Sequence, residues 1–81
     1  MKLQIYVLYD KVTMCSSQLM LARNNEEMLR ILRNNTTTDH KLSPEDFALY
    51  NIGDYEDTLM EIGYNKPEKI SELELVLQNK G

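Results

Sequence analysis

Near its start the chain reads Leu3-Gln4-Ile5-Tyr6-Val7-Leu8-Tyr9. The odd-numbered residues of this stretch are all apolar or aromatic, and the even-numbered residues from Lys2 to Leu8 are half polar. A period of two with β-branched and aromatic residues predicts a β-strand. Because its second side is also half apolar, we expect this strand to be central in a sheet or to be covered by a partner. Asp10 and Lys11 then begin a turn.

A helix is predicted over residues 24–34. Asn24 suits the N-cap, and Glu27 lies three residues later, which is the spacing of a capping box. Acidic side chains in the first turn and basic side chains in the last turn match the helix dipole. An apolar stripe at helical spacing is formed by Met28, Leu29 and Leu32.

The rest of the chain predicts shorter elements. Further strands are expected at residues 18–22, 47–52 and 59–62, with a helical turn at Ser43-Pro44. We expect Gly53 and Asp54 to stop the second of these strands, residues 55–58 to form a turn and residues 63–66 to form a loop.

The tail, residues 67–80, is compatible with two structures. Pro67 and Glu68 favour a helix start, and four later apolar residues share one helical face. Alternate leucines in the same stretch are also typical of a strand. We favour a short helix. The four residues on the helical face are Ile70, Leu73, Val76 and Leu77.

Together these elements predict a small α+β domain. The sheet is expected to be mostly antiparallel, with three or four strands, and the 24–34 helix to pack on one of its faces. A short C-terminal helix is the favoured form of the tail. Eighty-one residues are too few for a second hydrophobic core, so residues 1–81 are expected to form a single domain.

Charge is unevenly distributed along the chain. The net charge is −4, yet residues 1–41 carry six basic and four acidic side chains, whereas residues 42–81 carry three basic and nine acidic ones. Nonspecific nucleic-acid binders usually have a strongly basic surface, because phosphate contacts supply most of that affinity. Overall acidity therefore argues against such a protein, although it leaves room for a local basic patch.

The sequence also predicts the cellular compartment of the protein. The one cysteine, Cys15, cannot form an intramolecular disulfide, which favours a reducing compartment. No apolar stretch approaches the length needed to cross a bilayer, and the N-terminal residues lack the apolar block of a signal peptide. We expect a cytoplasmic protein that does not contact membranes.

Few residues offer reactive chemistry. Cys15 and His40 are the one pair of nucleophile and base, and both fall in predicted loops where nothing fixes their geometry. The acidic residues between Asp54 and Glu61 lack the spacing of a calcium loop and are better explained as a solvated hairpin tip. We therefore expect no enzyme, no metal site and no cofactor.

Two groups of side chains are candidates for binding. Basic residues around the helix could hold phosphates or an acidic partner, and tyrosines on the sheet could stack on unpaired bases or form a dimer seam. The simpler alternative is that the arginines stabilise the helix C-terminus and the tyrosines fill a core. The basic group is Arg23, Arg30, Arg33 and Lys41, and the aromatic group is Tyr6, Tyr9 and Tyr50.

A third candidate is the sheet surface itself. One helix covers a four-stranded sheet poorly, so an apolar patch could remain exposed and mark a partner surface. Self-pairing is the simplest use of such a patch, and we expect a homodimer. The residues expected in the patch are Tyr6, Leu8, Met20 and Tyr50.

Several motifs resemble one protein family. The chain opens with a lysine-leucine strand ending in Tyr9-Asp10, and later runs from Ser43-Pro44-Glu45-Asp46-Phe47 into Leu49-Tyr50-Asn51-Ile52-Gly53 and the acidic Tyr55-Glu56-Asp57. This order resembles the small nonstructural protein of gokushovirus-type microviruses, which are tailless phages with single-stranded DNA. The chain departs from the family where Met14-Cys15-Ser16-Ser17 replaces a glycine and a proline, and where Thr58-Leu59 follows the acidic turn in place of glycine.

The resemblance implies a role but assigns no catalytic residues. It implies a nonstructural protein, absent from the virion, that acts in the bacterial host's cytoplasm. It further implies a role in viral DNA replication or in the switch to single-strand synthesis and packaging. We expect the protein to act there by binding single-stranded DNA, a viral replication protein or both. The alternative is a protein–protein adaptor that binds no nucleic acid and targets a host factor.

Overall fold

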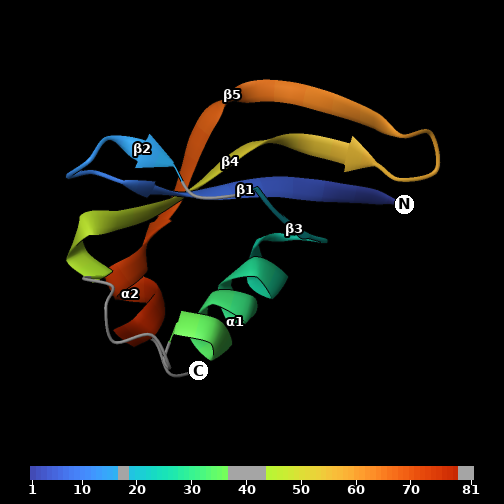
Figure 1. Ribbon diagram of the computed structural model, residues 1–81. Coiled ribbons are helices and arrows are strands. Elements are labelled where there is room, and N and C mark those ends of the chain that lie inside the picture. The colour runs from blue at the N-terminus through green and yellow to red at the C-terminus, as the bar shows by residue number, and fades with distance from the viewer. Residues whose placement is uncertain (17–18, 37–43, 79–81) are drawn as a thin grey trace.

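A computed structural model describes residues 1–16, 19–36 and 44–78. The described elements follow the order β1 (Lys2–Asp10), β2 (Cys15–Ser16), β3 (Met20–Ala22), α1 (Asn25–Thr36), η1 (Pro44–Asp46), β4 (Phe47–Glu56), β5 (Glu61–Glu72) and α2 (Leu73–Gln78). They form a five-stranded antiparallel sheet with both helices on one side of it (Figure 1). The predicted α+β class and the packing of one main helix on one face are confirmed, with five strands in place of three or four.

β1 is the centre of the sheet. It pairs with β4 along its whole length, from Lys2 opposite Glu56 to Asp10 opposite Phe47. Its other edge pairs with the short strands β2 and β3. The strand order is β2-β1-β4-β5, with β3 beside β1, so β5 is an outer strand. The central position predicted from the alternating stretch is confirmed.

The hydrophobic core lies between the sheet and the helices. Tyr6 and Leu8 of β1 belong to it, and Tyr6 is completely buried, with its hydroxyl donating a 2.6 Å hydrogen bond to Asn25 Oδ1. Burying a side chain of this size contributes about 1.5–3 kcal/mol. The largest fully buried side chains are Tyr6, Met28, Leu49 and Leu73.

α1 begins where the capping signal places it. The Asn24 side-chain oxygen accepts a 2.8 Å hydrogen bond from the Glu27 backbone N–H, and Arg23 Nε lies 2.9 Å from Glu27 Oε2. These contacts satisfy a donor that the first helical turn leaves unpaired. The predicted cap is confirmed, and the helix continues two residues beyond its predicted end, to Thr36.

The β4–β5 hairpin is much longer than predicted. β4 does not stop at Gly53 but reaches Glu56, and the turn lies at residues 57–60. β5 then includes the stretch predicted as a loop and the stretch predicted as a helix start. Those predictions were wrong because an outer strand tolerates Gly63 and Pro67, residues that would interrupt a central one.

Irregular pairing with β4 allows β5 to continue past Gly63 and Pro67. Between Asn51 and Gly53 of β4 the opposite strand advances from Glu68 to Tyr64, so it carries extra residues at this point. There, Asn65 Nδ2 donates hydrogen bonds to the carbonyl oxygens of Asn51 and Lys66, at 3.5 and 2.8 Å. The side chain thus takes over bonds of the interrupted ladder.

The tail combines both of its predicted forms. It remains a strand as far as Glu72, and α2 then begins at Leu73, six residues after the proline that suggested a helix start. Leu73 and Val76 are buried against the core, as a helical face would place them. The preference for a short helix is therefore confirmed for the end of the tail and wrong for its beginning.

Gly53 permits the close approach of β4 and β5. A Cβ atom at this position would lie 2.2 Å from the backbone oxygen of Gly63, far inside a normal contact. At Gly63, by contrast, a Cβ would meet the side-chain carboxyl group of Asp54, whose nearest oxygen lies at 2.5 Å, and that carboxylate can rotate away. The two glycines therefore differ in what a methyl group would displace.

We expect Gly53→Ala to lower the free energy of unfolding by about 1–3 kcal/mol, because the backbones of the two strands must separate. Urea denaturation followed by circular dichroism measures this loss. Gly63→Ala is the matched control and should cost clearly less. Equal losses for the two variants would contradict the proposed backbone contact.

The hairpin end also holds the N-terminal amino group. The Met1 nitrogen lies 2.8 Å from Glu56 Oε2 and 2.7 Å from Asp57 Oδ1. The hydrogen bond from this amino group, and next the one from the Thr58 backbone N–H, lower the pKa of Glu56 from 4.5 to about 2. A carboxyl group whose pKa falls on folding stabilises the folded protein above its unfolded pKa.

This stabilisation should be lost as the pH falls from 4.5 toward about 2, the interval between the two pKa values of Glu56. Acetylation of the Met1 amino group should raise the pKa of Glu56 and shift acid unfolding to higher pH. Carboxyl-carbon NMR titration of both forms measures the effect. An identical titration of Glu56 in the acetylated protein would show that the amino group is not the cause.

Candidate functional site

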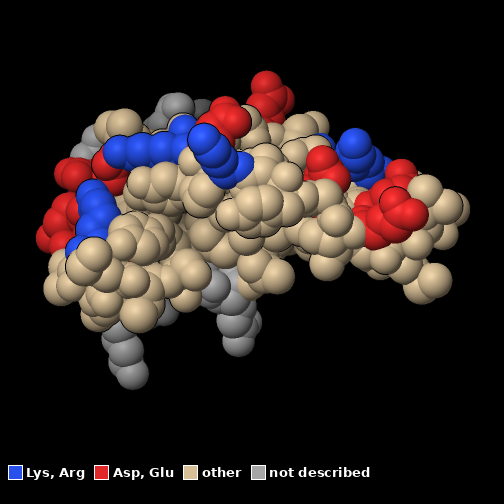
Figure 2. Space-filling model, turned by 90° about the horizontal axis from the view of Figure 1, so that it is seen from above, with Lys and Arg blue, Asp and Glu red and all other residues tan. Residues whose placement is uncertain are grey.

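The sheet has one side that no helix covers. We call it the open face: it is the side opposite α1 and α2, and it carries the odd-numbered residues of β1. Cross-strand partners share a face, so Tyr50, which pairs with Val7, lies on it too. Seen from the side of the molecule away from the helices, most of the surface is tan, and charged side chains lie mainly at its two ends and along one edge (Figure 2).

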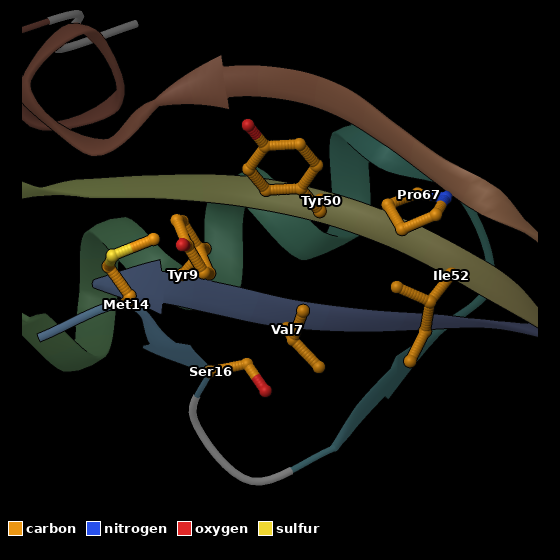
Figure 3. Close-up of a pocket in the computed structure, with 7 residues that line it drawn as sticks. All are labelled: Val7, Tyr9, Met14, Ser16, Tyr50, Ile52 and Pro67. Carbon is orange, nitrogen blue, oxygen red and sulfur yellow. The ribbon is translucent and has the colours of Figure 1, made fainter. Parts of the chain in front are cut away.

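One half of the open face is hollowed. The hollow has a volume of about 520 Å³, and Tyr9 and Tyr50 lie next to each other in its lining, packed edge to face with ring centroids 5.9 Å apart and planes at 81° (Figure 3). We call it the tyrosine hollow. Edge-to-face packing of this kind holds both rings in place while each keeps exposed surface. The lining residues are Val7, Tyr9, Met14, Ser16, Tyr50, Ile52 and Pro67.

Two lysines border this hollow. Lys69 is the ladder partner of Tyr50, and Lys11 follows Tyr9 by two residues. Both bind Glu72: Lys11 Nζ lies 2.9 Å from Glu72 Oε2, and Lys69 Nζ contacts Oε1. We call Lys11 and Lys69 the lysine pair. One carboxylate thus serves both ammonium groups.

The hydrogen bonds to Glu72 are visible in the pKa values. The hydrogen bond from Lys69, and after it the one from Lys11, lowers the pKa of Glu72. The same bond to Glu72 raises the pKa of Lys69. Both shifts favour the charged forms, so Lys69 and Glu72 are both ionised at neutral pH.

The other half of the open face is apolar and forms a second, smaller hollow of about 250 Å³. Leu19, Leu21 and Ile62 are 62%, 46% and 70% exposed, around the base formed by Ile5 and Tyr55. We call these five residues the leucine patch. It ends at the acidic tip of the β4–β5 hairpin, which we define as Glu56, Asp57 and Glu61. An exposed apolar surface with charges at its margin is typical of a binding surface.

The predicted aromatic site is divided by the sheet. Tyr9 and Tyr50 meet on the open face, whereas Tyr6 lies in the core on the opposite side. The expected exposed patch of Tyr6, Leu8, Met20 and Tyr50 is therefore wrong, because Tyr6 and Leu8 are 0% and 8% exposed. Tyr6 and Leu8 point toward α1 and α2, which together cover this side of the sheet.

The predicted basic group does not join the tyrosines. Arg30 and Arg33 belong to α1, on the covered side of the sheet. Arg23 precedes α1, pairs with Glu27 and lines a small polar depression of about 340 Å³ with Asn24 and Glu68. Lys41 and His40 fall outside the described residues, as does any contact they make.

The remaining candidates are the reactive cysteine, a metal site and a membrane-spanning helix. Cys15 is an exposed free thiol in β2. Across residues 1–16, 19–36 and 44–78, no group of three or more His, Cys, Asp or Glu side chains is arranged to hold a metal ion. None of the helices described has the length and apolar character to cross a membrane.

The sequence did not point to the lysine pair, Met14 or Pro67 as parts of a site. Lys69 and Pro67 were assigned to a helix, so their place beside Tyr50 could not be seen. The charge pattern could have indicated Lys69 as a candidate. Residues 42–78 are otherwise acidic, and Lys66 and Lys69 are their two lysines.

Met14 shows strain at the edge of the tyrosine hollow. Its φ is 60°, in the left-handed region, and its side chain is 74% exposed. The turn is held by a 2.8 Å hydrogen bond from the Met14 N–H to the Asp10 carbonyl oxygen. A left-handed backbone costs a residue with a side chain about 1–2 kcal/mol, which glycine avoids.

We expect Met14→Gly to leave the free energy of unfolding unchanged or to raise it by up to about 1 kcal/mol, because the strain outweighs the added chain entropy. Denaturant unfolding monitored by tyrosine fluorescence measures it. Val12→Gly, in the same exposed turn but without a positive φ, should lower stability instead. A loss for Met14→Gly as large as that for Val12→Gly would contradict the strain at Met14.

Comparisons with known proteins identify the chain's relatives. No curated protein and no solved structure matches it with significance. Residues 3–76 match the family described as Phage ORF5 protein. The match includes β1 to β5, both halves of the open face and the lysine pair. The chain therefore belongs to the Phage ORF5 protein family.

Proposed function

We propose that this phage protein acts in viral DNA replication by binding single-stranded DNA at the tyrosine hollow. The observation that carries the proposal is the pair of partly exposed rings, Tyr9 and Tyr50, bordered by the lysine pair. Aromatic rings offer stacking surfaces to unpaired bases of any sequence, and lysines contact the phosphates between them. Duplex DNA keeps its bases stacked inside, so it gains only the lysine contacts.

The expected binding is weak and sensitive to salt. Stacking is worth about 1–3 kcal/mol per base, and the hollow offers two rings. Glu72 partly neutralises the lysine pair, and the chain as a whole carries a charge of −4. Both effects reduce attraction for a polyanion. Such a protein would occupy single strands only where they are abundant, as in the switch from duplex replication to single-strand synthesis. We place this activity in the cytoplasm of the bacterial host, outside the virion.

A protein–protein adaptor is the second candidate function. It is favoured by the apolar lining of the hollow, where Val7, Met14 and Ile52 offer no stacking surface. The adjoining leucine patch extends this apolar surface along the face. In this alternative a viral replication protein or a host factor would bind the open face, and the protein would have no affinity for oligonucleotides.

Fluorescence anisotropy of labelled oligonucleotides distinguishes the two functions. We expect single strands to bind more tightly than duplexes, with an affinity that falls as salt rises. Tyr50→Ala should weaken single-strand binding by about 5- to 100-fold, and Tyr50→Phe should retain most of it, because the ring rather than the hydroxyl stacks. Lys69→Gln should reduce the slope of log affinity against log salt by about 0.7, the value for one phosphate contact on a single strand.

Arg30→Ala and Arg33→Ala are the controls on the covered side of the sheet. They should leave both the affinity and the salt slope unchanged, since α1 lies behind the hollow (Figure 3). A flattened slope in these variants alone would place the DNA on the helix layer and contradict the proposed site. Absence of binding at low salt would exclude the DNA function and favour the adaptor.

A further inference from the structure

We infer that a single strand of DNA binds in extended form along the whole open face, with one base at each of four tyrosines. The inference rests on the proposed function and deepens it, because it extends the binding site beyond the tyrosine hollow and fixes its length. Three features support this path: the spacing of the tyrosines, their exposure and the side of the sheet on which the carboxylates lie. The four tyrosines are Tyr9, Tyr50, Tyr55 and Tyr64.

Strand register places one tyrosine at each rung of the open face. Tyr9 lies on β1 itself, and Tyr50 of β4 pairs with Val7. Tyr55, also of β4, pairs with Leu3. Because ladder partners share a side of the sheet, these three tyrosines lie on the side of the odd-numbered residues of β1.

The remaining rung, that of Ile5, receives its tyrosine from the outer strand. Ile5 pairs with Gly53, and Gly53 pairs in turn with Tyr64 of β5. Ile62 belongs to the leucine patch, and side chains alternate along a strand, so Tyr64 points to the open face as well. Gly53 has no side chain, so the ring of Tyr64 has no side-chain neighbour from its ladder partner.

The spacing of these rungs suits an extended single strand. Residues on one side of an antiparallel strand follow each other at about 6.8 Å. Nucleotides in a stacked strand are about 3.4 Å apart, so a ring placed between two bases separates them by about 6.8 Å. The path follows β4, with Tyr9 and Tyr64 contributed by the strands on either side of it. Four rungs give a site of about four nucleotides, at the short end of the range for single-strand binding folds.

All four rings have exposed surface to offer to a base. Tyr64 is 85% exposed, and the other three are half-buried. Tyr6, the remaining tyrosine of the chain, is completely buried on the helix side of the sheet. An aromatic ring stabilises a fold through its buried area, so the ring of Tyr64 contributes little to the core and is available for stacking.

The register also turns most carboxylates away from this path. The even-numbered residues of β1 and their ladder partners lie on the side of the core residue Tyr6. Glu72, on the open face, is bound by the lysine pair. A polyanion therefore meets less repulsion on the open face than on the helix side. Of the six carboxylates in the described strands, the five on the helix side are Asp10, Asp54, Glu56, Glu61 and Glu68.

A third lysine lies beside the middle of the path. Lys66 is exposed and lies between Tyr64 and Pro67, in the stretch of β5 with irregular pairing. Among the lysines of the ranges 1–16, 19–36 and 44–78, it is the one without an ion pair. We assign it a phosphate contact near Tyr64, in addition to those of the lysine pair at the tyrosine hollow.

Fluorescence anisotropy with labelled oligothymidylates of about two, four and eight nucleotides tests the length of the site. Affinity should rise steeply from the dinucleotide to the tetranucleotide and little beyond it, because further bases find no tyrosine. Tyr64→Ala should weaken binding of the tetranucleotide by about 5- to 100-fold. It should leave binding of the dinucleotide unchanged, because two bases occupy the tyrosine hollow. Tyr64→Phe should retain the affinity of the wild type.

Leu75→Ala is the control for loss of an exposed apolar side chain away from the path. Leu75 is 58% exposed and belongs to α2, on the helix side, so this variant should bind as the wild type does. Circular dichroism establishes that each variant is folded. An equal effect of Tyr64→Ala on the dinucleotide and the tetranucleotide, or no effect on either, would overturn the inference.

The salt dependence of binding tests the lysine. Lys66→Gln should reduce the slope of log affinity against log salt by about 0.7 for the tetranucleotide. Lys2→Gln is the matched control, because Lys2 pairs with Glu56 on the helix side and should leave the slope unchanged. Equal slopes for the two variants would contradict the phosphate contact of Lys66.

NMR signals of the tyrosine rings map the path directly, with Tyr6 as an internal control. The tetranucleotide should shift the signals of all four tyrosines of the open face and leave that of Tyr6 in place. Shifts confined to Tyr9 and Tyr50 would overturn the extended path and leave the proposed function intact. Absence of binding by every oligonucleotide at low salt would disprove the proposed function and the path together.

Discussion

The pairing of β1 with β4 is the constraint on which the rest of the structure depends. It runs the full length of β1 and fixes, rung by rung, which side chains of both strands enter the core and which remain on the open face. An irregularity at Ile52 is accommodated without loss of this division, because Ile5 pairs with Gly53 on one side of it and Tyr6 with Asn51 on the other. A shift by one residue would exchange Tyr6 with a residue of the open face.

Tyr6 connects this ladder to the helix layer. Its ring is buried among the core side chains, and its hydroxyl donates to Asn25 at the first turn of α1. Burial raises the pKa of the Tyr6 phenol, which keeps it neutral and able to donate. The position of α1 over one side of the sheet, and hence the exposure of the other side, follows from contacts of this kind.

The sequence predicted the features that depend on local patterns. Alternation identified β1, and the pair Asn24 and Glu27 identified the start of α1, because both signals arise within a few residues. The length of β5 could not be predicted in this way. Gly63 and Pro67 interrupt most strands, and their tolerance here depends on the outer position of β5, which is a property of the whole sheet.

The kinds of residue in the candidate site, tyrosines and basic side chains, could be predicted from the sequence. Which of these residues lie together could not. Tyr9 and Tyr50 are far apart in the chain, and only the register of β1 and β4 brings their rings together. Which tyrosine of β1 faces the helices was undetermined, since both sets of alternating residues contain a tyrosine. The lysine pair joins them from two further segments, and no short-range pattern connects Lys11 with Lys69.

The interrupted pairing of β5 has a consequence for assembly. An outer strand with an unbroken row of backbone donors and acceptors recruits further strands without limit, which leads to fibres. Pro67 has no N–H to offer, and the extra residues around Asn65 bend the strand away from a straight template. Lateral growth into filaments through this strand is therefore disfavoured.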